Sequence, residues 1–465
     1  MSAPSSRVGA TLEAERDRHL AELVELLRFP SVSAVSDRRD DVLGCAAWLR
    51  EQLESIGLEH ASLLETGGNP IVYGDWLHAG PDAPTALLYG HYDVQPPEPL
   101  ELWQSPPFEP TFRDGRVYAR GATDNKSQVF LNLKAIETLL RADGALPCNV
   151  KVIVEGEEEL RADNLEGFVE ENADLLQADV AVICDSNLYA AGVPGIVIGL
   201  RGMAALELTV RTAEVDAHSG VYGGAVPNAL HALAVLLDSL HDPGDGRVLV
   251  EGFYEAVRPL TAEEREQWSR LPFDEARVRD ALGLSRLFGE ADYTPVERLT
   301  ARPTLELNGA WGGYEGEGIK TVIPAEAHAK LSCRLVPDQE PEDVLLAIRR
   351  HLDRRTPPGA VVTIDFELAG ARPMLTPPDH PAIRAAVVAL AEAYGSEPVL
   401  FRSGWSVPVV EILDRKLGLD SVLLGFGLPD ENAHAPNEHF HLDNFDRGLR
   451  TMTAFWHRLA AEGFD

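Results

Sequence analysis

The sequence predicts an α/β protein in which a larger domain, built on a mixed and mostly parallel sheet, is interrupted by a smaller α+β domain. Three observations support this fold class. Short apolar runs alternate with amphipathic helical patterns towards both ends of the chain, as in buried parallel sheets. Beyond residue 202 the first strand-like run instead alternates apolar and polar residues, as in a sheet with one exposed face. At 465 residues, the chain also exceeds what one hydrophobic core usually serves.

The first part of the larger domain, residues 1–202, begins with two amphipathic helices. Leucines at helical spacing mark residues 11–28, and a second helix over residues 41–56 ends at Gly57. Strands and helices then alternate, which favours a buried parallel sheet. We expect, in order, a strand at 83–89, a long proline-rich loop, a helix at 126–140, a strand at 149–154, a helix at 165–172 and a strand at 178–184.

The smaller domain is predicted to span residues 203–376, after which residues 377–465 complete the larger domain. Residues 241–302 are polar and acidic, and we expect them to be irregular. The other predicted elements of the smaller domain are strands at 204–211, 304–307, 327–335 and 361–368 and helices at 227–240 and 341–354. The larger domain then resumes with a helix at 381–394, a strand at 399–402, a helix at 408–416, a strand at 421–426 and a helix at 442–459.

Bulk composition limits the classes of protein that this chain can be. Its 41 Lys and Arg residues against 74 Asp and Glu residues give a net charge of −33, which argues against nucleic acid or an anionic membrane as a partner. The cysteines Cys45, Cys148, Cys184 and Cys333 are scattered, without a Cys-x-x-Cys pair, which fits a reducing compartment. The sequence has no apolar signal region at its start and no run of eighteen or more apolar residues. We expect a cytoplasmic protein.

Acidic and imidazole side chains follow several of the predicted strands at the point where each strand ends. Open α/β sheets bind their ligands beyond the carboxyl ends of the strands, so we expect these side chains to converge. Carboxylate oxygens and imidazole nitrogens together are the donors that a pair of divalent cations requires. The sequence therefore predicts a metal-dependent hydrolase. The candidate metal ligands are His91, Asp124, Glu159, Asp185 and His434.

Two more acidic residues have predicted roles beside these ligands. His91 and Asp93 lie two apart on an extended segment and so project to the same face, where Asp93 can hold the second ring nitrogen of a metal-bound His91. Neighbours on an extended segment point opposite ways, so one of Glu158 and Glu159 can bind metal while the other faces substrate. A carboxylate left off the metal is a natural general base.

Each of these residues also has a plainer interpretation when it is taken alone. His91 and Asp93 are compatible with a hydrogen-bonded pair that caps a strand, and Asp124 with the N-cap of the helix that follows it. The glutamate run that ends at Glu159 is compatible with a solvated loop, and His434 with an exposed loop histidine. What favours the metal site is that the residues occur as a set, with four of the five sites at or just past the end of a predicted strand and Asp124 between a turn and a helix.

Several segments of the chain carry a family pattern. They are Gly90-His-Tyr-Asp-Val-Gln-Pro96, Trp103-Gln-Ser-Pro-Pro-Phe108, Arg120-Gly-Ala-Thr-Asp124, Glu155-Gly-Glu-Glu-Glu159, Gly199-Leu-Arg-Gly202, Asp216-Ala-His-Ser-Gly-Val-Tyr-Gly-Gly224, Lys320-Thr-Val-Ile-Pro324 and Arg334-Leu-Val-Pro337. In this order they resemble the M20 family of metallopeptidases and amidohydrolases, most closely its cytosolic non-specific dipeptidase (carnosine dipeptidase-like) branch. The likeness extends over nearly the whole chain, from about Leu20 to about Leu459.

The resemblance implies a dipeptidase with two divalent metal ions, Zn or Mn, in a zinc-exopeptidase-like domain. One ion would be held by His91, Asp124 and Asp185, and the other by Asp124, Glu159 and His434, with Asp124 bridging them. Glu158 would be the general base, and Asp93 would orient His91.

The resemblance also implies that the smaller domain is a ferredoxin-like lid through which two copies form a homodimer. His218 would reach into the active site of the partner subunit and stabilise the developing oxyanion. Arg334 would hold the C-terminal carboxylate of a small peptide substrate. The other residues expected to bind substrate are Thr321, Ser406 and His380.

Two departures from the family pattern leave the substrate open. Family dipeptidases commonly read Arg-Glu-Gly-Gly-Ser-Ile-Pro where this chain reads Arg402-Ser-Gly-Trp-Ser-Val-Pro408, and Leu160 stands where a small serine or threonine is usual. Ser403 stands in place of the family's glutamate, so a partner for the α-ammonium of a substrate is lost. Trp405 stands in place of a glycine and adds bulk beside the second metal. An N-acyl amino acid deacylase with the same metal site is therefore an alternative. A catalytically silent binding protein is a second one, which the full ligand set argues against.

Overall fold

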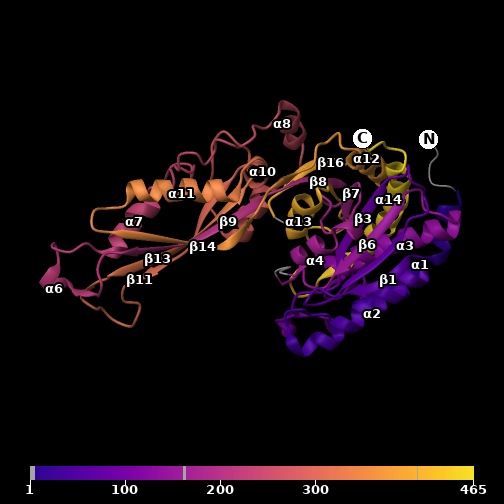
Figure 1. Ribbon diagram of the computed structural model, residues 1–465, viewed down its shortest axis with the longest axis horizontal. Coiled ribbons are helices and arrows are strands. Elements are labelled where there is room, and N and C mark those ends of the chain that lie inside the picture. Colours follow the sequence, from indigo (N-terminus) through magenta and orange to yellow (C-terminus); the bar gives the residue numbers. More distant parts are fainter. Residues whose placement is uncertain (1–5, 161–163, 406, 465) are drawn as a thin grey trace. The chain divides into compact units, whose positions relative to one another are not determined.

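A computed structural model describes residues 6–160, 164–405 and 407–464. The chain forms two compact units (Figure 1). The first comprises Met1–Ile198, Thr376–Phe401 and Pro408–Asp465, and the second comprises Gly199–Leu375 and Arg402–Val407. The segment Arg402–Val407, which the sequence analysis placed in the larger domain, thus clusters with the smaller unit.

A nine-stranded mixed sheet is the framework of the first unit. Its central strands are mutually parallel, and antiparallel strands flank them on both sides. The central order is β6 (Asn149–Glu155), β3 (Thr85–His91), β7 (Val180–Ile183) and β17 (Ser421–Leu423). The flanking strands are β2 (Ile71–Trp76) and β1 (Glu59–Leu64) next to β6, and β8 (Gly195–Leu200) and β15 (Met374–Leu375) next to β17, while β16 (Val399–Ser403) pairs with β8. The predicted mixed α/β fold is confirmed, with its parallel strands at the centre of the sheet.

Helices cover the central strands, which is why strands β6 and β7 are buried at every position. One group of helices packs together around α3 (Ser127–Asp143), whose residues are buried from Ser127 to Leu139. This group comprises α1 (Ser6–Leu27), α3, α14 (Leu442–Leu459) and α12 (Pro381–Tyr394), and α2 (Arg39–Ser55) packs on β1 and β2. A second group comprises α4 (Leu165–Glu171), α5 (Ala173–Leu176) and α13 (Pro408–Leu417) (Figure 1).

The second unit contains a four-stranded antiparallel sheet in the order β11-β13-β9-β14. Its elements follow the chain as β9 (Gly202–Arg211), α7 (Ala229–Asp238), β11 (Thr304–Gly312), β13 (Glu326–Leu335), α11 (Pro341–Arg355) and β14 (Val361–Ala371). This βαββαβ succession with its strand order is the ferredoxin-like arrangement. Helices α7 and α11 both pack on the sheet, and alternate residues of β13 are buried beneath them. The alternation of buried and more exposed positions that was expected in residues 204–211 is present in β9 from Leu206 to Arg211.

The prediction that residues 241–302 are irregular is wrong. This segment contains the helices α8 (Ala262–Ser269), α9 (Glu275–Leu282) and α10 (Pro295–Ala301). Two of them begin with a capping box, in which Thr261 pairs with Glu264 and Thr294 with Glu297. Such boxes stabilise the first turn of a polar helix that lacks a strong apolar stripe. Their signal in the sequence is the Thr-x-x-Glu spacing, not hydrophobic periodicity.

The remaining elements are short. Strands β4 (Thr111–Arg113), β5 (Arg116–Tyr118) and β18 (His439–His441) form a small antiparallel sheet, and β10 (Ala217–His218) pairs with β12 (Val322–Ile323). Within the described ranges, no helix combines the length and the apolar character needed to cross a membrane.

A buried histidine on α1 makes the stability of the first unit depend on pH. His19 is 1% exposed, and burial, with the positive charge of Arg18, lowers its pKa to about 4. Because the folded state disfavours the protonated ring, the contribution of His19 is complete above its ordinary pKa near 6.5 and is lost as the pH falls below it. We expect the free energy of unfolding to fall by about 2 kcal/mol between pH 7 and pH 5 through this residue alone.

Urea unfolding of the wild type and of His19→Gln at both pH values measures this contribution. The variant should show a fall that is smaller by this amount, and equal falls in the two proteins would contradict the assignment.

Candidate metal centre

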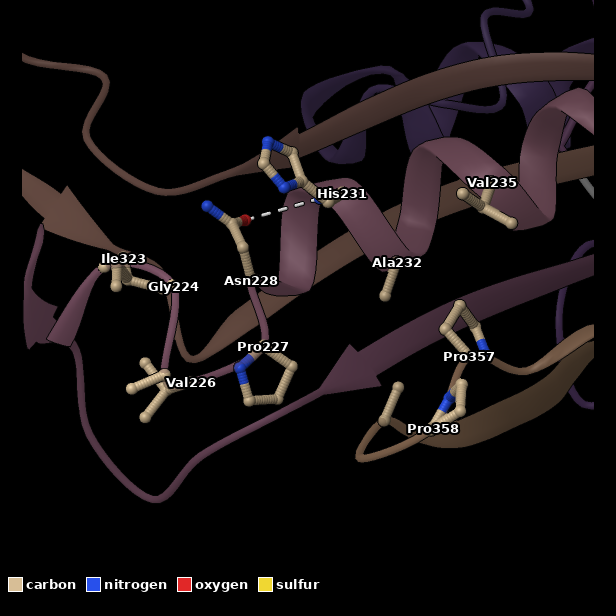
Figure 2. Close-up of a pocket in the computed structure, with 13 residues that line it drawn as sticks. Gly224, Val226, Pro227, Asn228, His231, Ala232, Val235, Ile323, Pro357 and Pro358 are labelled. Carbon is tan, nitrogen blue, oxygen red and sulfur yellow. Dashed lines mark hydrogen bonds between the residues drawn. The ribbon is translucent and has the colours of Figure 1, made fainter.

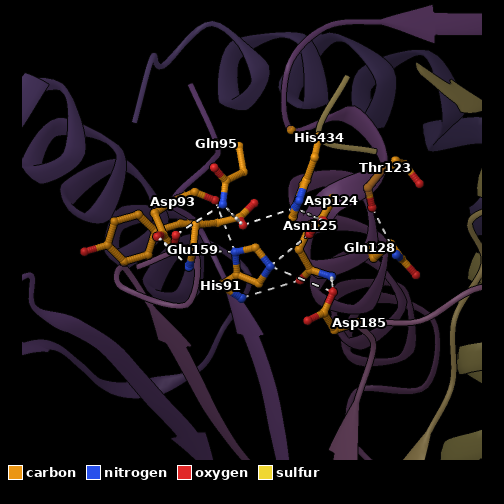
Figure 3. Close-up of polar contacts among 12 residues, drawn as sticks. His91, Asp93, Gln95, Thr123, Asp124, Asn125, Gln128, Glu159, Asp185 and His434 are labelled. Atoms are coloured by element: carbon orange, nitrogen blue, oxygen red, sulfur yellow. Dashed lines mark hydrogen bonds and ion pairs between the residues drawn. The ribbon is translucent and has the colours of Figure 1, made fainter. Parts of the chain in front are cut away.

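Five side chains predicted to bind metal lie together in the first unit (Figure 3). They form two groups that share Asp124. One group is His91, Asp124 and Asp185, and the other is Asp124, Glu159 and His434. In each group, one nitrogen or oxygen atom from every residue lies within 4.8 Å of the others. The structure thus brings together all five residues that the sequence analysis singled out.

Asp124 offers one carboxylate oxygen to each group. Its Oδ1 lies 3.1 Å from Nε2 of His91, and its Oδ2 lies 3.0 Å from Nε2 of His434. The other carboxylates complete the groups, since Nε2 of His91 is 3.8 Å from Oδ1 of Asp185 and Nε2 of His434 is 3.1 Å from Oε2 of Glu159. A carboxylate divided in this way is suited to bridge two cations.

The parallel strands explain why residues so far apart in the chain meet. His91 is the last residue of β3, Asp185 lies two residues beyond the end of β7, and Glu159 lies four residues beyond the end of β6. Strands β6, β3 and β7 are neighbours that run in the same direction, so their carboxyl ends share one edge of the sheet.

Asp124 lies in a short helical turn, Ala122–Lys126, that precedes α3. Its own φ of −123° and ψ of 96° are not helical, and the plainer interpretation as the N-cap of α3 is wrong because Lys126 occupies that position. The buried ammonium of Lys126 donates hydrogen bonds to the carbonyls of Phe29 (2.7 Å) and Leu26 (3.3 Å) at the end of α1. These bonds tie the turn of Asp124 to the end of α1 and to the loop that follows it.

His91 is held at its second ring nitrogen by Asp93. Nδ1 of His91 lies 3.1 Å from the backbone oxygen of Asp93 and 3.4 Å from its carboxylate Oδ1. The other carboxylate oxygen, Oδ2, accepts hydrogen bonds from Oγ of Ser33 (2.7 Å) and from the backbone N–H of Glu159 (3.1 Å). Asp93 therefore contacts both His91 and the segment that carries Glu159.

The segment that carries the glutamates is a turn rather than the extended segment expected. The N–H of Leu160 donates to the carbonyl of Glu157 at 3.1 Å, and the side chain of Glu157 accepts from the backbone N–H of Asn69 (2.9 Å) and from Nδ2 of Asn164 (2.7 Å). Glu157 thus anchors the turn, while Glu159 joins the second group. A run of like charges carries no signal for a turn, which is why an extended segment was expected here.

Burial and crowded carboxylates set the charges of the centre. Burial raises the pKa of Glu158 to about 8, and the nearby carboxylates add to this rise. Hydrogen bonds to Asp124 and Glu159 raise the pKa of His434 to about 10. Although burial raises the pKa of Asp124, hydrogen bonds from His434 and His91 outweigh it and hold that pKa below its usual range. Positive charge is therefore favoured between these carboxylates.

The amino-acid sequence matches Peptidase family M20/M25/M40 over residues 87–458. The chain belongs to this family. The cysteinylglycine-S-conjugate dipeptidase of Corynebacterium striatum is 32% identical over 436 residues, which cover 92% of each chain. The human Beta-Ala-His dipeptidase is 30% identical over 467 residues, which cover 96% of this chain and 91% of that one. Among solved structures, the M20 family metallo-carboxypeptidase Sso-CP2 of Sulfolobus solfataricus is 35% identical with a TM-score of 0.80, covering 95% of this chain and 99% of that one.

The prediction of an M20 metallopeptidase is confirmed by this match. The donor atoms agree with a metal-dependent hydrolase, because three carboxylates and two imidazoles within reach of one another are ligands that divalent cations accept. They do not select one ion, since zinc and manganese both accept this set.

Four polar residues that the sequence analysis left without a role support the ligands of this M20 centre. Gln95 donates from Nε2 to Oε2 of Glu159 at 2.8 Å, and Asn125 donates from Nδ2 to Oδ1 of Asp185 at 3.0 Å. Thr123 and Glu438 fix the turn that carries Asp124. Gln95 lies two residues from Asp93 and Asn125 one residue from Asp124, so proximity in the sequence could have indicated their supporting roles. Glu438 is 314 positions from its partner Asp124, and nothing in the sequence links the two.

The other predicted site residues of this M20 chain are spread over both units. His218, Thr321 and Arg334 belong to the second unit, where the segments of His218 and Thr321 adjoin, with the N–H of Ser219 donating to the carbonyl of Thr321 at 3.1 Å. His380 caps α12, and within the described part of the first unit it contacts Asp420 and Phe464 rather than the five ligands. Ser406 lies outside the described residues.

Removing ligands tests the two groups separately. We expect His434→Ala to lose one of two bound ions, because His434 belongs to one group only, and Asp124→Asn to weaken both, because it belongs to both. Metal analysis after gel filtration measures the ions per chain. His380→Ala is the matched control and should keep the wild-type content. An Asp124→Asn protein that retains both ions would contradict a bridging role.

Proposed function

We propose that this M20 chain hydrolyses the peptide bond of dipeptides with the help of two divalent cations, zinc or manganese. The observation that carries this proposal is the division of the Asp124 carboxylate between two groups of metal-binding side chains. Two relatives at 30% and 32% identity are dipeptidases by name. Bound divalent cations at such a site lower the pKa of water and polarise the carbonyl under attack.

In the proposed mechanism, Glu158 is the general base. It follows the anchored Glu157 in the turn and directly precedes the ligand Glu159, so it lies beside the metal groups without belonging to either. Bound cations would favour the ionised form of Glu158, and a carboxylate that binds neither ion is free to accept a proton. Glu158 would take a proton from the attacking water and pass it to the amine of the leaving amino acid.

Replacing this carboxylate separates proton transfer from metal binding. We expect Glu158→Gln to lower kcat by about 100-fold to 10,000-fold, the usual contribution of a general base, and to keep both ions. Dipeptide hydrolysis and metal content measure the two effects. Full activity in the variant would refute the assignment, and Glu157→Gln serves as the control for an adjacent carboxylate that anchors the turn.

The substrate is proposed from the family resemblance and from the second unit. Arg334, which is partly exposed on β13, would hold the C-terminal carboxylate of the substrate, with Thr321 and Ser406 as further substrate-binding residues. His380, which was expected to be another, is left out of this proposal, because it contacts Asp420 directly before β17, at the sheet edge opposite the ligands. The alternative is an N-acyl amino acid deacylase, favoured by Ser403 where the family carries a glutamate. A carboxypeptidase acting on longer peptides is a further one, because the solved relative at 35% identity has that name.

A panel of substrates on ion-free protein reloaded with zinc or manganese distinguishes these activities. Dipeptides with a free α-amino group should be hydrolysed faster than N-acetyl amino acids or tripeptides. Preference for the acylated compounds would establish the deacylase instead, and absence of cleavage with either ion would refute the proposed function.

We propose further that the second unit joins two copies of this chain. It exposes large apolar side chains, among them Val215, Val221 and Ile319, with exposed fractions of 73%, 68% and 95%. A pocket beside α7 is lined mainly by apolar groups such as Val235 and Pro358 (Figure 2). Large apolar side chains that are more than two-thirds exposed are often buried by a partner protein, and a symmetric homodimer is the commonest assembly.

His218 would act across this dimer. The ring accepts a hydrogen bond at Nδ1 from the N–H of Gly220 (3.0 Å), so that the neutral ring carries its proton on Nε2. From there it can donate to an oxyanion that develops in the active site of the partner subunit.

We also propose that the protein is cytoplasmic. This is supported by its four cysteines, which are all free and buried.

Mixing two inactive variants tests whether His218 of one subunit completes the active site of the other. Glu158→Gln and His218→Ala should each be nearly inactive, but heterodimers of the two regain one intact site. Random exchange of subunits should restore about one quarter of the wild-type activity. A mixture no more active than its components, under conditions where subunit exchange is verified, would contradict action across the dimer.

A further inference from the structure

A fully buried carboxylate joins the two segments that carry Asp124 and His434. Glu438 has no exposed surface and lies four residues after His434, directly before β18. The backbone carbonyl of Glu438 accepts from the N–H of Ala119 at 3.1 Å, so its main chain and its side chain both contact the segment that leads to Asp124.

The side chain of Glu438 accepts four hydrogen bonds. Its Oε1 accepts from the backbone N–H groups of Thr123 (2.9 Å) and Asp124 (3.1 Å). Its Oε2 accepts from the backbone N–H of Gly121 (2.9 Å) and from Nη1 of Arg120 (2.6 Å). Arg120 is itself buried, with 1% exposure, and its Nη2 donates to the carbonyl of Pro96 at 3.2 Å. The described hydrogen-bond partners of the carboxylate are therefore three backbone amides and one guanidinium.

These bonds determine the path of the chain at Asp124. Gly121 has a φ of 83°, and Asp124 has non-helical angles inside a turn that the N–H of Lys126 closes by donating to the carbonyl of Gly121 at 3.1 Å. The amides of Gly121, Thr123 and Asp124 converge on one carboxylate. The position of the Asp124 carboxylate follows from that of its backbone.

We propose that Glu438 is a positioning residue that sets the spacing between Asp124 and His434, and so controls the affinity for the ion that these two residues share. Among the described residues its carboxylate makes no hydrogen bond or ion pair with a ligand side chain, so it would act through the backbone of Asp124 and through its own segment. The inference rests on the proposed function, because it requires that the Asp124, Glu159 and His434 group holds an ion. Outer residues that orient metal ligands commonly change affinity by about 10-fold to 100-fold when they are replaced.

The proposed role of Glu438 predicts different effects on the affinities of the two ions. Glu438 lies on the segment of His434, which belongs to the second group, and has no contact with His91 or Asp185 among those described. Loss of the carboxylate should therefore weaken the ion of the Asp124, Glu159 and His434 group more than the other ion. A general loss of stability would instead affect the whole unit.

The test compares Glu438→Gln and Glu438→Asp with a matched control. Glutamine keeps the shape but turns an NH₂ group toward two donors, while aspartate keeps both acceptor oxygens on a shorter side chain. The control is Glu137→Gln on α3, a carboxylate that is 2% exposed and paired with Lys134 at 2.9 Å. It lies ten residues into α3, roughly 15 Å along the helix axis.

Stepwise titration of the ion-free proteins with cobalt, followed by absorption, yields an affinity for each ion, and His434→Ala identifies the spectrum of the second group. We expect Glu438→Gln to weaken the second ion by about 10-fold to 100-fold and the first ion much less, with partial recovery in Glu438→Asp. Glu137→Gln should leave both affinities unchanged even where it lowers the melting temperature.

Unchanged affinities in Glu438→Gln, or equal losses for both ions, would overturn the inference. If the glutamine variant does not fold, the same titration of Glu438→Asp decides, and wild-type affinities there would overturn it as well. A wild-type protein that binds fewer than two ions contradicts the proposed function instead, so the two failures are distinguishable.

Discussion

Carboxylates crowd at one sheet edge of this protein, and positive charge between them is what makes the crowding tolerable. Asp124 shows the constraint most directly, because its two oxygens face the imidazoles of His91 and His434 at 3.1 Å and 3.0 Å. The carboxylates Asp124 and Glu159 raise the pKa of His434, and crowded carboxylates add to the larger effect of burial in raising the pKa of Glu158. A carboxylate that cannot share in the positive charge is driven toward its neutral form, while an imidazole among carboxylates is driven toward its charged form.

The ligand set could be predicted from the sequence because it follows from chain direction. Parallel strands place their carboxyl ends together, so His91, Glu159 and Asp185 are each marked by the apolar run that precedes them. His434 lies in a loop eleven residues beyond the end of β17, so it was a candidate only as a member of the set. The turn at Glu157 was not predicted. Its side-chain partners, the backbone N–H of Asn69 and the side chain of Asn164, lie in other segments and produce no periodic pattern in the sequence.

The support around the ligands could not be predicted in the same way. Glu438 contacts residues more than 300 positions earlier in the chain, and a single sequence carries no information about such pairs. The helices within residues 241–302 were missed for a different reason. They are stabilised by their caps and by local bonds rather than by a long apolar stripe, and a search for periodicity alone overlooks helices of this kind.

The buried ammonium of Lys126 gives the N-terminal helix a role that its position in the chain does not suggest. The family match begins only at residue 87, which makes α1 look like a dispensable extension. The carbonyl of Leu26 near its end and that of Phe29 just beyond it nevertheless accept the hydrogen bonds of Lys126, two residues from Asp124. Trimming the protein back to the matched region would remove both acceptors of this ammonium, and with them the bonds that hold the turn of Asp124 against the end of α1. Shortened versions of this hydrolase therefore need to retain α1 if the turn of Asp124 is to survive.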